Sequence, residues 1–249
     1  MRNIQFTKMQ GLGNDFVVVE GPASFTHDEV SRLCDRRFGI GADGILVVTR
    51  LDPVRMEYWN ADGTAAEMCG NGLRCIARYV YDRGWVQERN FRVDTPLGVR
   101  GARVLADLVE VDLGPVRVTG SHTFDGMEFD LVDVGNPHAV TFVSDPTKVD
   151  VDAVGRAIQS EFPKGTNVEF VAVSDSGIEL RVWERGVGET LACGTGMAAA
   201  AMAARTRHAT GDTVAVDVPG GRATVEIRDG RVWLRGPAEY SFRGSVGER

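Results

Sequence analysis

Two cysteines, Cys69 and Cys193, stand at matching positions in two halves of the chain that resemble each other. Each opens a glycine-rich segment, Cys69-Gly70-Asn71-Gly72 in the first half and Cys193-Gly194-Thr195-Gly196 in the second. Two thiols on opposite sides of one cleft can remove a proton from one face of a carbon and return a proton to the other face. The pattern therefore predicts an acid–base pair of cysteines that acts on a small molecule.

The similarity of the two halves extends beyond the cysteines. Trp59 and Trp183 are 124 residues apart (183 − 59), the same offset that separates Cys69 from Cys193. Other pairs keep an offset of 122 to 124 residues: Asn14 with Asn136, Phe38 with Phe162, Gly41 with Gly165, Asp94 with Asp217, and Pro115 with Pro237. Because solenoid repeats have periods of only about 20–50 residues, we interpret the pattern as a domain duplication.

Both cysteines are expected in loops that enter helices. The backbone N–H groups and the positive end of the helix dipole stabilise a thiolate there, and such a setting lowers the pKa of a thiol from about 8.5 toward neutrality. One cysteine could then act as the base while its partner keeps a proton and acts as the acid. A lone cysteine is more often a small buried apolar residue, but the duplicated position favours the acid–base pair.

The glycines of the two motifs leave backbone amides open to an anion. We expect a substrate carboxylate to bind there, held by the helix starts at Gly70, Asn71, Gly194 and Thr195. The same amides would stabilise the negative charge that develops when an α-proton leaves. A tight turn without a ligand is the alternative for either motif alone.

A second set of polar residues follows apolar strands: Asn14, Asn60, Asn136, Asn167, Glu184 and Arg185. Together they suit a substrate end that carries both an amine and a carboxylate, with Arg185 on the carboxylate and Glu184 on the ammonium. A lone asparagine in a turn more often satisfies its own backbone. His138 could tune one of the cysteines or be an ordinary loop histidine.

Composition narrows the classes of function. The 249 residues are 43% apolar and 25% charged with a net charge of −7, so we expect an ordinary globular protein without a nucleic-acid partner. The N-terminal residues lack the apolar core of a signal peptide, and the longest apolar run, 197–204, is too short to cross a bilayer. We therefore expect a cytosolic protein without a membrane partner, in which the four cysteines stay reduced.

Neither a metal nor a cofactor is expected. The chain has no Cys-x-x-Cys pair and only four histidines, which gives a structural zinc site little support. The segment Gly39–Gly44 spells G-x-G-x-x-G but leads into the apolar run 45–48, which is typical of a strand, whereas a dinucleotide loop must start a helix. The three lysines occur in no evident cofactor setting.

The patterning predicts an α+β fold of two pseudo-symmetric domains, each a curved mixed β-sheet wrapped around a central α-helix. Helices are expected from about Thr26 to Cys34, from Asn71 to Gly84, and from Thr195 to about Arg207. The last of these is apolar on nearly every face and should be buried on all sides. The domain boundary is expected after residue 114, giving 1–114 and 115–249, with the last ten residues or so able to pack on either half.

Five segments together resemble the diaminopimelate epimerase family, which works without pyridoxal phosphate. The matching segments are Lys8–Phe16, Asp35–Gly44, Asn60–Gly63 with Glu67–Cys75, Gly135–His138, and Glu184–Gly186 with Glu189–Thr190 and Ala192–Gly196. They follow the family order along nearly the whole chain.

The resemblance implies the paired-domain epimerase fold and interconversion of LL- and meso-diaminopimelate, a step toward lysine and peptidoglycan precursors. It implies that Cys69 and Cys193 are the acid–base pair, assisted by His138 and Glu184. It also implies that Asn14, Asn60, Asn136, Asn167, Glu184 and Arg185 hold the distal end of the substrate, while Gly70, Asn71, Gly194 and Thr195 hold the carboxylate at the reacting centre.

The chain departs from the family pattern in two places, and two other functions remain as alternatives. Gly44 occupies a position where some members carry a substrate-contacting glutamine, and the region from 101 to 133 is shorter than expected. A racemase of another amino acid on the same scaffold, or a thiol redox protein with a reversible disulfide, are the rival functions. The oligomeric state stays open, with a homodimer as one assembly that the sequence allows.

Overall fold

The computed structural model of the chain describes residues 3–65 and 69–247. Its contacts divide the chain into two compact units, Met1–Val111 with Pro237–Arg249 and Asp112–Gly236, here called unit 1 and unit 2. The division falls inside strand β7 (Val109–Pro115), slightly ahead of the boundary expected after residue 114. Strand β17 (Glu239–Gly247), at the end of the chain, belongs to unit 1.

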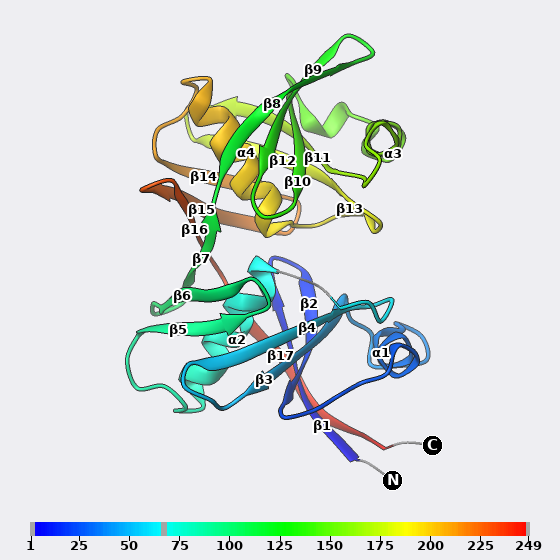
Figure 1. Cartoon of the computed structure of the whole chain (residues 1–249), viewed down its shortest axis with the longest axis vertical. Coiled ribbons are helices and arrows are strands. Elements are labelled where there is room, and N and C mark those ends of the chain that lie inside the picture. Colours follow the sequence, from blue (N-terminus) through cyan, green and yellow to red (C-terminus); the bar gives the residue numbers. More distant parts are fainter. Residues whose placement is uncertain (1–2, 66–68, 248–249) are drawn as a thin grey trace. The chain divides into compact units, whose positions relative to one another are not determined.

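Unit 1 contains one mixed sheet, coloured mainly blue to green in Figure 1. Neighbouring strands follow the order β17-β1-β2-β3-β4-β5-β6-β7, in which β2–β3 and β4–β5 are parallel and the other pairs antiparallel. The remaining strands of this sheet are β1 (Asn3–Gly11), β2 (Asn14–Glu20), β3 (Gly44–Thr49), β4 (Val54–Asn60), β5 (Asn90–Thr95) and β6 (Gly98–Val104).

Unit 2 repeats this scheme. Its order is β8-β9-β10-β11-β12-β14-β15-β16, again with the third and fifth pairs parallel and the others antiparallel. A short strand β13 adds to β12, and β16 also pairs with β7. The strands are β8 (Arg117–Phe124), β9 (Met127–Asp133), β10 (Pro137–Phe142), β11 (Asn167–Ser174), β12 (Gly177–Glu184), β13 (Gly188–Thr190), β14 (Thr213–Val218), β15 (Gly221–Arg228) and β16 (Arg231–Gly236). The identical succession of pairings confirms the duplicated fold class.

A buried helix forms the centre of each unit. Helix α2 (Gly70–Asp82) packs on β1, β2, β3 and β6, and helix α4 (Gly194–Thr206) packs on most strands of unit 2 (Figure 1). The alanines of α4 are almost all fully buried, as the all-round apolar pattern predicted. Their small side chains let the surrounding strands approach the helix closely.

Two helices lie outside the centres. Helix α1 (His27–Cys34) starts at Thr26, whose hydroxyl accepts the Glu29 N–H while the Glu29 carboxylate binds back to Thr26, so the predicted capping box is confirmed. Helix α3 (Val151–Glu161), preceded by the 3₁₀ turn Pro146–Lys148, was not anticipated. Its apolar face packs on β11 and β12, so tertiary contacts decide its presence.

Candidate active site

Asn14 is positioned by the tight hairpin turn between β1 and β2. Leu12 and Gly13 both have positive φ, 59° and 82°, which matches the two-residue turns that join antiparallel strands. The turn places Gly11 opposite Asn14, so Asn14 is the first residue of β2.

Cys69 is the N-cap of α2. Its backbone is extended (φ −141°, ψ 109°), and its sulfur accepts the N–H of Gly72 at 3.3 Å. The thiol donates to Asn14 Oδ1 at 3.5 Å, and that oxygen also accepts Asn71 Nδ2 at 3.1 Å. The first N–H groups of a helix lack intrahelical partners, so the segment beginning at Gly70 has the donors that an anion requires.

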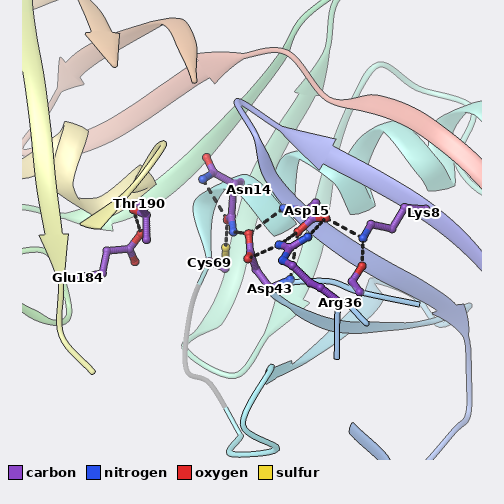
Figure 2. A network of polar contacts seen from close by, with 10 residues as sticks. Lys8, Asn14, Asp15, Arg36, Asp43, Cys69, Glu184 and Thr190 are labelled. Atoms are coloured by element: carbon purple, nitrogen blue, oxygen red, sulfur yellow. Dashed lines mark hydrogen bonds and ion pairs between the residues drawn. The ribbon is translucent and has the colours of Figure 1, made fainter. Parts of the chain in front are cut away.

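A chain of polar contacts extends from Asn14 away from the sulfur (Figure 2). Asn14 Nδ2 donates to Asp43 Oδ2 at 2.6 Å, and Arg36 bridges Asp43 and Asp15 at 2.8 and 2.7 Å. Lys8, itself almost fully buried, pairs with Asp15 at 2.7 Å and donates to the Gly41 carbonyl. Burial alone would raise the pKa of Asp15, but hydrogen bonds from Arg36 and Lys8 outweigh it and lower that pKa.

Cys193 occupies the equivalent position in unit 2. It is the N-cap of α4 (φ −116°, ψ 117°), and its sulfur accepts the N–H of Gly196 at 3.3 Å, the same bond that Cys69 makes. The hydroxyl of Thr195 lies 3.4 Å from the sulfur. In both units, therefore, the sulfur takes the place that a serine or aspartate oxygen usually fills at a helix start.

Glu184 lies beside Cys193. Its Oε1 accepts the Thr190 hydroxyl at 2.5 Å. Burial raises the pKa of Glu184, and the hydrogen bonds that Glu184 forms with Thr190 and Cys193 reduce this rise. Burial, followed by the charge of Glu184, raises the pKa of Cys193 well above its ordinary value. At Cys193, therefore, desolvation exceeds the lowering of the pKa that a helix-entry position commonly gives.

His138 is held inside unit 2 by two partners. Its Nδ1 lies 2.6 Å from Glu169 Oε1, with both side chains fully buried, and its Nε2 lies 3.0 Å from Asn136 Oδ1. Because an amide oxygen only accepts, Nε2 carries the hydrogen of that bond. Asn136 Nδ2 in turn donates to Thr195 Oγ1 at 3.4 Å, which connects the imidazole to the segment that holds Cys193.

Three residues expected at the distal end of a substrate make contacts with their own unit. Asn60 Nδ2 donates to Thr64 Oγ1 at 3.0 Å within the turn after β4. Asn167 is buried; its Nδ2 donates to Pro137 O and its Oδ1 accepts the backbone N–H of Arg185. The exposed Arg185 guanidinium donates to Lys164 O at 3.3 Å. These bonds position the turns, and the roles of the three residues toward a substrate stay predictions.

Within residues 3–65 and 69–247, no group of three or more His, Cys, Asp or Glu side chains is arranged to hold a metal ion. All four cysteines are free thiols. No helix in this part of the chain has both the length and the apolar character needed to cross a membrane.

Comparison with known proteins decides the family. A model of the family described as diaminopimelate epimerase matches residues 6–119 and 131–240. The chain belongs to the diaminopimelate epimerase family. The protein named diaminopimelate epimerase from Desulfitobacterium hafniense is 41% identical and that from Pelotomaculum thermopropionicum 40%, with coverage of 97% of this chain in each case and 97% and 98% of those proteins.

Solved structures share the fold of the family at low identity. A phenazine biosynthesis protein of the PhzF family from Bacillus anthracis aligns with a TM-score of 0.78 and 14% identity over 100% of both chains. A hydroxyproline epimerase from Agrobacterium vitis aligns with a TM-score of 0.77 and 15% identity over 98% of this chain and 92% of that one. These likenesses concern the fold alone.

The structure explains one departure from the diaminopimelate epimerase pattern. Gly44 is buried at the start of β3, and a Cβ there would lie 2.4 Å from Trp59 O and 2.5 Å from the Tyr58 ring. A glutamine cannot be accommodated at this position unless β4 moves. The family model also leaves 120–130 unmatched, within the region that we expected to be short.

Sequence reasoning missed several residues that contact the predicted site residues. Asp15, Arg36 and Asp43 lie within the matching segments but received no role, and Glu169 lies outside them. The apolar run of β11 offered a signal for Glu169, since a charged residue at a fully buried position of an apolar strand needs a partner. Glu67 and Met68, part of the matching motif, lie outside the described residues.

Proposed function

We propose that this chain is a cofactor-independent epimerase that interconverts LL-2,6-diaminopimelate and meso-diaminopimelate. The observation that carries the proposal is the repeated placement of a cysteine as N-cap of the buried central helix, with its sulfur 3.3 Å from a helix N–H in both units. The curated relatives at about 40% identity over nearly the whole chain support the same substrate.

In the proposed reaction, one sulfur acts as a thiolate that takes the α-proton, and the other acts as a thiol that delivers its own proton to the opposite face of the same carbon. The products are the inverted centre, a new thiol and a new thiolate, so protons and charge balance. The helix N-termini at Gly70–Asn71 and Gly194–Thr195 bind the α-carboxylate and stabilise the charge that develops on it.

Glu184 and His138 have separate supporting parts in this scheme. Because the raised pKa of Cys193 keeps its proton on sulfur in the resting state, Glu184 is the group placed to accept that proton. His138, fixed by Glu169, orients Asn136 toward Thr195. Asn14, Asn60, Asn136, Asn167 and Arg185 hold the distal amino-acid end of the substrate.

The direct test is incubation of the purified protein with LL-diaminopimelate, without added cofactor, followed by chiral analysis. We expect meso-diaminopimelate to accumulate, and we expect Cys69→Ala and Cys193→Ala each to lower kcat by at least about 10³-fold, the usual effect of removing an essential acid or base. Cys34→Ala is the matched control, since Cys34 is a buried thiol whose pKa burial raises to about 12. Full activity in either single variant would refute the two-base mechanism.

A racemase of another amino acid is the second candidate. The contacts of Asn60 and Arg185 favour this candidate. Both side chains form hydrogen bonds within their own unit, although they were expected to hold the distal end of diaminopimelate. Deuterium uptake from heavy water, measured with a panel of amino acids, separates the two candidates. Diaminopimelate alone should exchange its α-proton at a catalytic rate.

We also propose that the protein works in the cytosol, in lysine and peptidoglycan precursor biosynthesis, as a homodimer. The assembly is measured by size-exclusion chromatography with light scattering. A mass near the 27.0 kDa of the single chain would contradict the dimer.

A further inference from the structure

The amide of Asn14 has one orientation that fits its neighbours. Its Nδ2 lies 2.6 Å from Asp43 Oδ2, and an ionised carboxylate only accepts hydrogen bonds, so the nitrogen must face Asp43. The Asn14 oxygen therefore faces the other way, toward Cys69 Sγ at 3.5 Å and Asn71 Nδ2 at 3.1 Å. Asp43 does not touch the sulfur, yet it decides which atom of Asn14 does.

Asp43 is itself held in place by charge and backbone. Arg36 donates to Asp43 at 2.8 Å and to both oxygens of Asp15 at 3.0 and 2.7 Å. The backbone N–H of Asp15 donates to Asp43 Oδ2 at 3.0 Å, and the N–H of Asp43 donates to Asp15 Oδ1 at 3.1 Å. With Lys8 on Asp15, the network contains two cations and two carboxylates, so both carboxylates are compensated (Figure 2).

In unit 2 a different group, a histidine, contacts the equivalent asparagine. Asn136 stands at the position equivalent to Asn14, but its oxygen accepts from His138 Nε2 at 3.0 Å. Its nitrogen consequently faces the helix start and donates to Thr195 Oγ1 at 3.4 Å. The same asparagine thus presents an acceptor to the cysteine segment in unit 1 and a donor in unit 2.

We propose that Asp43 is a positioning residue that keeps the Asn14 oxygen against the Cys69 thiol. An oxygen there stabilises the protonated sulfur, whereas an amide nitrogen would stabilise the thiolate. Asp43 therefore limits how much of Cys69 is thiolate before substrate arrives. This inference rests on the proposed function for the importance of Cys69, but its test measures the thiol itself and does not depend on turnover.

The test is the rate at which iodoacetamide alkylates Cys69 at fixed pH, followed by peptide mass spectrometry. In Asp43→Asn, Asn14 can turn its nitrogen toward the sulfur, and we expect alkylation to rise about fivefold, the worth of one hydrogen bond. In Arg36→Gln the Asp43 carboxylate and its bond to Asn14 remain, and we expect a change below about twofold. Arg74, whose charge also reaches Cys69, is unchanged in both variants.

A matched control is available on unit 2. Arg222 and Asp217 form an ion pair at 2.6 Å with side-chain exposures of 59% and 40%, the same as those of Arg36 and Asp43. Asp217→Asn removes an equivalent carboxylate and should leave the alkylation of Cys69 unchanged.

A second variant covers the case in which Asp43→Asn does not fold. Exchanging the two residues, Asn14→Asp with Asp43→Asn, restores a carboxylate–amide bond and leaves an oxygen facing Cys69 in either orientation. Its alkylation rate should be at or below that of the unaltered protein. An unchanged rate in Asp43→Asn, an equal rise in Arg36→Gln, or a rise in the exchanged variant would each overturn the proposal.

Discussion

At the scale of residues, the site depends on cysteines that cap helices. An N-cap side chain usually supplies an oxygen to a free N–H of the first turn, and here sulfur does so in both units. The same contact supports the fold and stabilises negative charge on the sulfur. At Cys193 burial and the nearby Glu184 charge outweigh this stabilisation, so in the proposed reaction this thiol needs a neighbouring base.

In the proposed mechanism, Thr190 controls how readily Glu184 acts as that base. Its hydroxyl bond lowers the pKa of Glu184, so Thr190→Val should raise this pKa further. Because only the ionised carboxylate can accept the Cys193 proton, the acidic limb of the pH–rate profile should move to higher pH. We expect kcat/KM at the acidic end to fall about fivefold, with less change at high pH. If the acidic limb does not move, Glu184 takes no part in proton transfer. Thr213→Val, at an exposed strand position, is the control.

The sequence was sufficient to find the cysteines and the residues beside them, but not the carboxylates Asp43 and Glu169 that contact those residues. A repeated motif identifies Cys69 and Cys193. Their contacts as helix N-caps can be predicted because each joins residues only a few positions apart in the sequence. The bonds from Asn14 to Asp43 and from His138 to Glu169 join residues about 30 positions apart, so they depend on which strands become neighbours. The sequence also left open which cysteine keeps its proton, because burial cannot be read from local spacing.

At the scale of elements, the central helices were predictable and the peripheral helix of unit 2 was not. Helices α2 and α4 carry continuous apolar patterns and begin within a residue of the expected positions. Helix α3 has a short apolar face and a glycine in its interior, both weak signals. The parallel pairings β2–β3 and β10–β11 also require long-range information.

The glycine inside α3 is required for close packing. A Cβ at Gly155 would lie 2.5 Å from Cβ and Cγ of Trp183 on β12. Glycine to alanine normally stabilises a helix interior by about 0.5–1 kcal/mol, but here we expect Gly155→Ala to destabilise the protein by about 1–3 kcal/mol. Denaturant unfolding measures the difference. Gly120→Ala is the control, since no atom lies within 4 Å of its added Cβ, and a stabilised Gly155→Ala would show that Trp183 can move aside.

At the scale of the whole molecule, the duplication is not symmetric in its connectivity. Unit 2 is continuous from Asp112 to Gly236, whereas unit 1 receives its last strand, β17, from the far end of the chain. Strand β17 pairs with β1 from Asn3 to Gln10 and covers an edge that would otherwise be open. The order of antiparallel and parallel pairings is nevertheless the same in both units.

We therefore predict different behaviour for the isolated units. Residues 112–236 contain all eight strands of their repeat and should unfold cooperatively as a separate fragment. Residues 1–111 should not, because the β1 edge is unpaired, and joining 237–249 to them through a flexible linker should restore a cooperative transition. Circular dichroism during thermal unfolding measures the transition of each of these three fragments. A cooperative transition in residues 1–111 alone would show that β17 is dispensable.

The position of β17 also bears on how the protein is made. A ribosome releases the residues of unit 2 as one uninterrupted block. The strands of unit 1 emerge earlier but must wait for more than half of the chain to be translated before their sheet is complete. During that interval the edge of β1 is unpaired, so we expect it to be a site where chaperone protection lowers aggregation.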